Sequence, residues 1–218
     1  MVYESATAKQ LAELLLQIKA IELRPKEPFT WASGMKSPIY CDNRVTLSHI
    51  PVRNYLREQM SALIEKEFPG AEVIAGVATG GIALAALVAQ ELNLPMIYVR
   101  SKAKGHGRQN LVEGHMEPNA RVVVIEDLIS TGGSSLTAVE GLRNQGAQVL
   151  GMAAIFTYAF QRAEDAMNDH DVKLFTLSDY HHLITTAEEK LYIPSDTAST
   201  LKEWRENPQA WSESFESK

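Results

Sequence analysis

The chain has 218 residues, of which 45% are hydrophobic and 22% are charged, so it is long enough to bury a core and ordinary in composition for a soluble globular protein. Its net charge of -6 and its pI near 5.6 argue against a nucleic-acid-binding protein, because such proteins usually carry a basic surplus. The single cysteine, Cys41, excludes an intrachain disulfide and a cysteine-rich zinc site.

The amino-terminal third is predicted to hold two helices and a hairpin. No apolar segment of signal-peptide length opens the sequence, which favours a soluble, cytoplasmic protein without a membrane partner. Apolar residues recur at helical spacing over 11–18, after a Thr7-x-x-Gln10 pair with the spacing of a capping box. Apolar and polar residues alternate on either side of the Ser33-Gly34 pair, which predicts a hairpin within 29–44. A second helix is expected over 51–67.

The rest of the chain alternates apolar runs with helical patterns. Strands are predicted over 73–77, 96–99, 121–125 and 149–158, and helices over 81–92 and 134–145. Apolar strands that alternate with helices indicate a parallel sheet covered on both faces. Weaker patterns predict a helix over 163–168, a strand over 173–177, and helices over 182–190 and 198–206. We expect one α/β domain, with a hood at about 1–45, a core at about 50–180 and a helical tail at about 181–218.

The segment 122–135, VVVIEDLISTGGSS, is the most informative part of the sequence. We expect a buried strand to end at Ile125 and a helix to open at about Ser134, with two glycines between them. Ligands of open α/β sheets bind beyond the carboxyl ends of the strands, and glycines let consecutive backbone N–H groups face one anion. Hydroxyl groups at 130, 131, 134 and 135 and the positive end of the helix complete a predicted phosphate site. The segment has neither the lysine of a Walker loop nor the glycine spacing of a dinucleotide site.

Two carboxylates, Glu126 and Asp127, stand directly before this predicted phosphate site. A carboxylate so close to a bound phosphate would repel it, so its partner is expected to be neutral or cationic. Sugar hydroxyls and a Mg²⁺ ion on a second phosphate both meet this requirement. A phosphate site with two carboxylates beside it predicts a binding site for a phosphorylated sugar. The alternative is that Glu126 and Asp127 are merely solvated residues at a strand end.

The order of hydrophobic run, Glu-Asp, two hydrophobic residues and Ser-Thr-Gly-Gly-Ser resembles the signature of type I phosphoribosyltransferases. The resemblance implies their α/β fold, a central, mostly parallel sheet flanked by helices, with a small hood from the terminal segments. It also implies that the acidic pair binds the ribose hydroxyls of phosphoribosyl pyrophosphate (PRPP) and that the loop holds its 5′-phosphate. The residues so assigned to PRPP are Glu126, Asp127, Leu128, Ile129, Ser130, Thr131, Gly132, Gly133 and Ser134.

Two further loops resemble parts of the same family. Residues 77–81, VATGG, are similar to its pyrophosphate loop, which assigns Thr79 and Gly80 to PRPP. The segment 101–119 has no periodicity and concentrates cations in an acidic chain. Residues 100–108, RSKAKGHGR, resemble the mobile catalytic loop of orotate phosphoribosyltransferases, in which cations reach the pyrophosphate across a dimer interface. The matching PRPP contacts are Arg100, Lys104 and His106, and the expected catalytic residues are Lys104, His106 and Asp127.

The base is indicated by residues 29–44, FTWASGMKSPIYCDNR, which resemble the hairpin Phe-x-x-x-Ser-Gly-x-x-Ser-Pro-x-Tyr of the orotate enzymes. The resemblance implies transfer of ribose 5-phosphate from PRPP to orotate in pyrimidine biosynthesis, with Lys26 and Ser130 as orotate contacts. It further implies a requirement for Mg²⁺, carried by PRPP without direct protein ligands, and a homodimer that shares the catalytic loop across its interface. The alternatives are a purine phosphoribosyltransferase and a non-catalytic regulator that senses PRPP.

Overall fold

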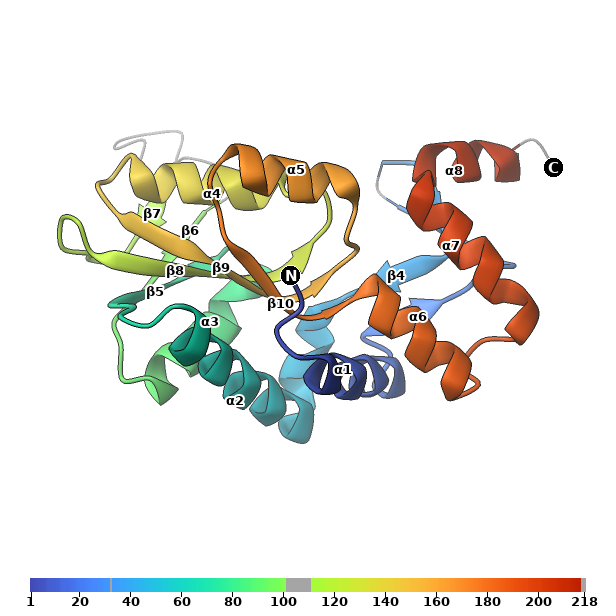
Figure 1. Ribbon diagram of the computed structural model, residues 1–218, viewed down its shortest axis with the longest axis horizontal. Helices are drawn as coiled ribbons and strands as arrows, with labels where there is room; N and C mark the ends of the chain where they lie inside the picture. Colours follow the sequence, from blue (N-terminus) through green and yellow to red (C-terminus); the bar gives the residue numbers. More distant parts are fainter. Residues whose placement is uncertain (32, 101–110, 217–218) are drawn as a thin grey trace.

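The central sheet of the computed structural model, which describes residues 1–31, 33–100 and 111–216, is mostly parallel (Figure 1). Its strand order is β10-β9-β8-β5-β6-β7, and among the strand pairs described in this sheet only β6 and β7 are antiparallel. The strands are β5 (Val73–Val77), β6 (Met96–Val99), β7 (Val112–Glu113), β8 (Arg121–Ile129), β9 (Gln148–Thr157) and β10 (Leu174–Asp179). Because the parallel strands point the same way, their carboxyl ends share one edge of the sheet, where the predicted site lies.

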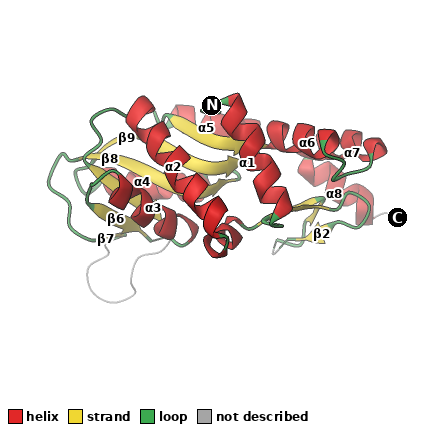
Figure 2. Cartoon of the chain, turned by 90° about the horizontal axis from the view of Figure 1, so that it is seen from below, coloured by secondary structure: helices red, strands yellow, loops and turns green. Residues whose placement is uncertain are grey.

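Helices cover both faces of this sheet, as its apolar strands require (Figures 1 and 2). One face carries α1 (Ser5–Gln17), α2 (Ile50–Glu67) and α3 (Gly80–Glu91), and the other carries α4 (Gly133–Arg143) and α5 (Gln161–Asp169). On β8, Val123 and Ile125 belong to the first core, whereas Val122 and Val124 belong to the second. This alternation with a period of two confirms a sheet buried on both sides and the predicted α/β fold.

The hood, residues 21–41 and 180–216, brings together strands from the first part of the chain and helices from the last part (Figure 2). β1 (Ile21–Leu23) pairs with β4 (Ile39–Cys41), and β2 (Phe29–Thr30) with β3 (Lys36–Ser37), both antiparallel. The predicted hairpin is confirmed, and Gly34 within it has a left-handed φ of +87°. The helices of the hood are α6 (Tyr180–Glu189), α7 (Ala198–Glu206) and α8 (Pro208–Glu216), with the short 3-10 helix η2 (Ser195–Thr197). A second 3-10 helix, η1 (Asn43–Ser48), lies outside the hood and contacts α2 and β8.

Some local predictions differ from the structure. The strand predicted to end at Ile125 continues to Ile129, because its last residues stay paired in register with the end of β9. The prediction of a capping box at Thr7 was wrong. Helix α1 begins at Ser5, and the Thr7 hydroxyl donates to Gln59 Oε1 at 2.9 Å instead of capping the helix. The short strand β7 and the final helix α8 were not predicted. Among the described residues, no helix combines the length and the apolar character needed to cross a membrane.

Candidate active site

The predicted phosphate site lies in the turn between β8 and α4. Gly132 adopts a left-handed conformation with φ +83°, which favours glycine, and α4 then begins at Gly133. A Cβ atom at Gly133 would meet no heavy atom of the described residues within 4 Å, so the helix start faces open space. Backbone N–H groups at a helix start, with room in front of them, are suited to an incoming phosphate. The other residues assigned to this turn or to the strand end before it are Leu128, Ile129, Ser130, Thr131 and Ser134.

The two carboxylates before this turn lie within β8 and differ in environment. Glu126 is 5% exposed; its Oε1 accepts from the Asp127 backbone N–H and its Oε2 from the Ser135 hydroxyl, both at 3.0 Å. Burial, reinforced by the neighbouring Asp127 carboxyl, raises the pKa of Glu126 to about 9, so its neutral form dominates at pH 7. Asp127 is only partly buried. The pair therefore provides one buried acid and one accessible carboxylate.

The position of Asp127 is fixed from two sides. The side-chain amide of Asn43, a residue that is 2% exposed at the start of η1, donates to the backbone carbonyl of Asp127 at 2.6 Å. On the other side, the Asp127 carboxyl occupies the space where a Cβ atom at Gly80 would lie. Gly80 therefore makes room for the carboxyl. Sequence reasoning missed Asn43, whose only signal is its place in the hairpin segment 29–44.

The second predicted loop joins β5 to α3 directly beside β8. A Cβ atom at Gly81 would lie 2.5 Å from the carbonyl oxygen of Ile125, so the start of α3 touches the strand that carries the acidic pair. Thr79 is exposed, and Gly80 adjoins Asp127. The structure therefore brings together the two loops that were assigned to PRPP.

The remaining predicted contacts are only partly within the described residues. Arg100 directly follows β6, and its guanidinium forms an ion pair with Glu113 Oε1 at 3.4 Å. Lys26 lies in the hood, where its ammonium pairs with Asp196 Oδ2 at 3.4 Å and both side chains are largely exposed. The loop cations Lys104 and His106 lie outside the described residues, and their roles stay predictions.

The donor atoms of this region do not form a metal centre of their own. Among the described residues, no group of three or more His, Cys, Asp and Glu side chains could hold a metal ion. Glu126 is buried, its pKa is raised by burial and by the Asp127 carboxyl, and both of its oxygens already accept hydrogen bonds, which leaves Asp127 as the available carboxylate of the pair. Mg²⁺ typically keeps several waters and takes one or two carboxylates besides substrate phosphates. The donor set fits a Mg²⁺ ion carried by a polyphosphate substrate.

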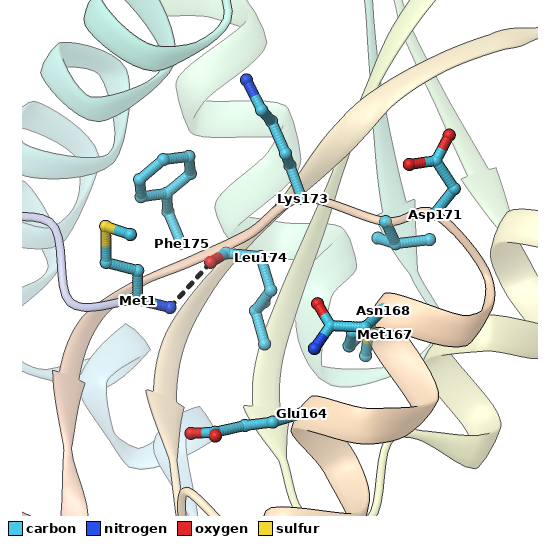
Figure 3. A pocket seen from close by; sticks show the side chains of 9 residues that line it. Met1, Glu164, Met167, Asn168, Asp171, Lys173, Leu174 and Phe175 are labelled. Carbon is cyan, nitrogen blue, oxygen red and sulfur yellow. Dashed lines mark hydrogen bonds between the residues drawn. The ribbon is translucent and has the colours of Figure 1, made fainter.

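A cavity of about 490 Å³ lies away from this edge, between α5 and β10 (Figure 3). Met1 lines it, and the Met1 ammonium donates to the carbonyl oxygen of Leu174 at 2.9 Å. Leu174 begins β10, whereas the phosphate turn follows the carboxyl end of the parallel strand β8. The cavity and the turn therefore lie at opposite ends of the strands, and the cavity is not part of the candidate active site.

Comparison with known proteins identifies relatives that match most of the chain. Residues 54–189, which hold the phosphate turn, the acidic pair and the loop before α3, match the model of the phosphoribosyl transferase domain family. A curated relative from Listeria innocua, named orotate phosphoribosyltransferase, is 53% identical over 203 residues, which cover 93% of this chain and 97% of the relative.

Solved structures give the same result. The crystal structure of orotate phosphoribosyltransferase from Aeropyrum pernix aligns with a TM-score of 0.73 at 28% identity and covers 84% of this chain and 99% of its own. The enzyme of that name from Mycobacterium tuberculosis H37Rv, solved in complex with PRPP, aligns with a TM-score of 0.63 at 25% identity over 81% of this chain and 98% of its own. The chain belongs to the phosphoribosyl transferase family and, within it, to the orotate phosphoribosyltransferases.

Proposed function

We propose that this protein is an enzyme that transfers ribose 5-phosphate from PRPP to orotate, with release of pyrophosphate, in pyrimidine biosynthesis. The observation that carries the proposal is the junction at the end of β8, where the accessible carboxylate of Asp127 precedes the open helix start at Gly133. A phosphorylated sugar needs both features, because N–H groups bind the phosphate and a carboxylate binds the hydroxyls. Family membership and the hairpin of the hood support orotate as the base.

In this proposal the 5′-phosphate binds at residues 128–134, which comprise the end of β8, the turn after it and the start of α4. The left-handed Gly132 and the open Gly133 let backbone N–H groups converge, and the α4 dipole adds positive potential. The net charge of the chain is -6, so this local field, and not a global attraction, holds the anion. Further donors to the phosphate are the hydroxyl groups of Ser130, Thr131 and Ser134.

Asp127 accepts hydrogen bonds from the ribose hydroxyls, and Glu126 holds Asp127 in place. The neutral Glu126 accepts the backbone N–H of Asp127 and is fixed by Ser135. A second ionised carboxylate here would repel Asp127 and the substrate phosphates. Burial avoids this repulsion by keeping Glu126 protonated, and a protonated carboxyl can itself donate to a ribose oxygen if substrate binding exposes it.

The reaction breaks the bond between ribose C1 and a pyrophosphate oxygen and forms a bond between C1 and a ring nitrogen of orotate, which loses its proton. Positive charge develops on the ribose and negative charge on the leaving pyrophosphate, so stabilising the leaving group lowers the barrier. In this proposal the backbone at Thr79 and Gly80 holds the pyrophosphate. Mg²⁺ bound to the pyrophosphate supplies further charge neutralisation. The cations assigned to the same group are Arg100, Lys104 and His106.

Orotate is placed between Ser130 and the hood. Lys26 must open its ion pair with Asp196 to reach the base, and such an exposed pair is worth about 0–1 kcal/mol, so opening it costs little. The protein is proposed to act as a homodimer in which the cation-bearing loop within residues 100–117 of one subunit completes the site of its partner. The length of this segment and its cations support a reach beyond the subunit that carries it.

The test is the loss of orotate absorbance when the purified protein, PRPP and Mg²⁺ are mixed. Orotate should disappear and pyrophosphate should form in equal amount, whereas adenine, hypoxanthine and guanine should leave PRPP intact. Removal of Mg²⁺ by a chelator should stop turnover. Equal or faster turnover of a purine would overturn the choice of base, and PRPP binding without turnover of any base would favour a non-catalytic regulator.

A further inference from the structure

The carboxyl-terminal helices α7 and α8 return to the predicted base-binding hairpin. The backbone N–H of Lys36, in β3, donates to the Ser212 hydroxyl of α8 at 2.8 Å, and α8 packs against β3. These contacts join residues 176 positions apart in the sequence. The two helices are therefore attached to the hairpin that the proposed function places around the base.

Trp204 of α7 connects the hairpin to the ends of two strands of the sheet. Its side chain is fully buried, and its ring lies 5.6–5.9 Å from four other aromatic rings. These rings are Trp31 of the hairpin, Tyr158 and Phe160 after β9, and Tyr180 after β10. Aromatic clusters of this kind add favourable ring contacts to the burial of a large apolar area, so Trp204 packs the hairpin against both strand ends.

Arg205, the next residue of α7, is hydrogen-bonded to the turn that follows β9. Its Nη2 donates to the carbonyl oxygen of Ala159 at 2.6 Å and its Nε to that of Tyr158 at 3.3 Å. Ala159 has a left-handed φ of +52°, which L residues other than asparagine and aspartate seldom adopt. A guanidinium offers a planar fork of donors, so it can hold both carbonyls of this strained turn at once.

The same turn contacts the phosphate site on one side and the hairpin on the other. The backbone N–H of Tyr158 and the hydroxyl of Thr157 both donate to the carbonyl oxygen of Ile129, which precedes the phosphate turn, at 3.1 and 3.3 Å. The Tyr158 ring stacks on Trp31 with centroids 5.9 Å apart. The phosphate side is also held by the strand pairing of β8 with β5 and β9, whereas the hairpin side depends on the aromatic and tail contacts.

A cavity of about 330 Å³ opens between the hairpin, this turn and α7. Trp31 and Phe160 contribute aromatic surface to it, and Arg162 and Arg205 contribute cations. Arg162 is exposed, and its guanidinium lies 5.9 Å from the centre of the Phe160 ring. Arg205 therefore differs from its neighbour in the cavity by its bonds to the turn carbonyls.

We propose that Arg205 is a positioning residue for the base: it fixes the turn 158–160 and thereby the hairpin that encloses the base, without contacting the reacting atoms. This inference rests on the proposed function, because it takes the hairpin as the base-binding element. It assigns the carboxyl-terminal helices a role in base affinity beyond that of stabilising the fold. Phosphate affinity should depend on Arg205 much less, because the sheet holds the phosphate turn independently.

The experiment compares binding of orotidine 5′-phosphate and ribose 5-phosphate by calorimetry, since the two ligands share the phosphate and differ in the base. Arg205→Ala should weaken binding of orotidine 5′-phosphate about tenfold and change that of ribose 5-phosphate by less than about twofold. Arg205→Lys keeps the charge but replaces the planar fork of donors with a single nitrogen, so its loss should be intermediate. Arg162→Ala, the matched control in the same cavity, should bind both ligands as the wild type does.

The outcomes separate the inference from the proposed function. If Arg205→Ala and Arg205→Lys bind orotidine 5′-phosphate as tightly as the wild type, or lose both ligands equally, the positioning role is wrong. A lowered melting temperature with unchanged binding would also overturn it, because it would leave only a structural role. If Arg205→Ala does not fold, Arg205→Lys carries the test alone. A wild-type protein that binds both ligands equally would instead contradict the proposed choice of base.

Discussion

Replacement of Glu126 by glutamine should stabilise the protein at neutral and alkaline pH. Burial raises the pKa of the Glu126 carboxyl to about 9, from an ordinary value of 4.5 that the unfolded chain should retain. Between these values the folded state keeps a proton that the unfolded state has lost. The stability contributed by this group is therefore complete below about pH 4.5 and is lost as the pH rises toward 9.

The size of the effect follows from proton linkage. A difference of one bound proton changes the free energy of unfolding by about 1.4 kcal/mol per pH unit, so between pH 6 and 8 the wild type should lose up to about 3 kcal/mol relative to Glu126→Gln. For a chain of this length, about 3 kcal/mol corresponds to roughly 6–12 °C in Tm. The local hydrogen bonds survive, because the new carbonyl accepts from Asp127 N–H and the Ser135 hydroxyl can rotate to accept from the new amide.

Urea midpoints followed by circular dichroism across this pH range measure the effect. The control is Glu58→Gln, which removes a carboxylate whose side chain is 56% exposed and should leave the pH dependence of stability close to that of the wild type. Parallel stability profiles for the wild type and Glu126→Gln between pH 6 and 8 would refute the reasoning. They would show that Glu126 is ionised in the folded protein.

Asp127→Asn should lower kcat by about 10²–10⁴ and leave the urea midpoint unchanged, because this carboxylate serves the substrate; an unchanged kcat would remove it from the mechanism. Gly81→Ala should lower the free energy of unfolding by about 1–3 kcal/mol in urea titrations, because its Cβ would lie 2.5 Å from the Ile125 carbonyl oxygen. Gly133→Ala should not lower stability, since open space surrounds it among the described residues, but it should raise the KM for PRPP; an equal KM would show that the phosphate binds elsewhere. Co-refolding of equal amounts of Lys104→Ala and Asp127→Asn chains should recover about a quarter of wild-type activity, because half of the dimers are hybrids with one intact site each. Activity no greater than that of the parents, with subunit exchange shown by tag pull-down, would place the loop and the site in one subunit.

The sheet could be predicted from the sequence because its apolar runs are clearly bounded by turn residues. β5 and β6 have the predicted bounds, and the glycines and hydroxyl groups of the phosphate turn are contiguous in the chain. The end of β8 was placed four residues too early, because two carboxylates interrupt its apolar run. Pairing with β9 continues through them, since the backbone hydrogen bonds of a strand do not depend on side-chain polarity.

The contacts that hold the site together could not be predicted in the same way. Asn43 and Asp127 are 84 positions apart, and Arg205 and Ala159 are 46 apart, so no local periodicity links them. The raised pKa of Glu126 likewise depends on how deeply the fold buries it. The sequence pattern located the acidic pair, but only the tertiary structure distinguishes its buried member from its accessible one.

The three tryptophans of the chain all belong to the hood, and none lies in the sheet or in the helices that cover it. Trp204 and Trp211 are buried in α7 and α8, and Trp31 packs edge-on against Trp204 at 5.9 Å. Fluorescence excited selectively in tryptophan is therefore an optical probe of this part of the molecule alone, whereas circular dichroism also reports on the sheet and its helices. If the hood is less stable than the core, the fluorescence midpoint in a urea titration will lie at a lower urea concentration than the dichroism midpoint. The difference between the two midpoints would measure how much less stable the hood is than the core.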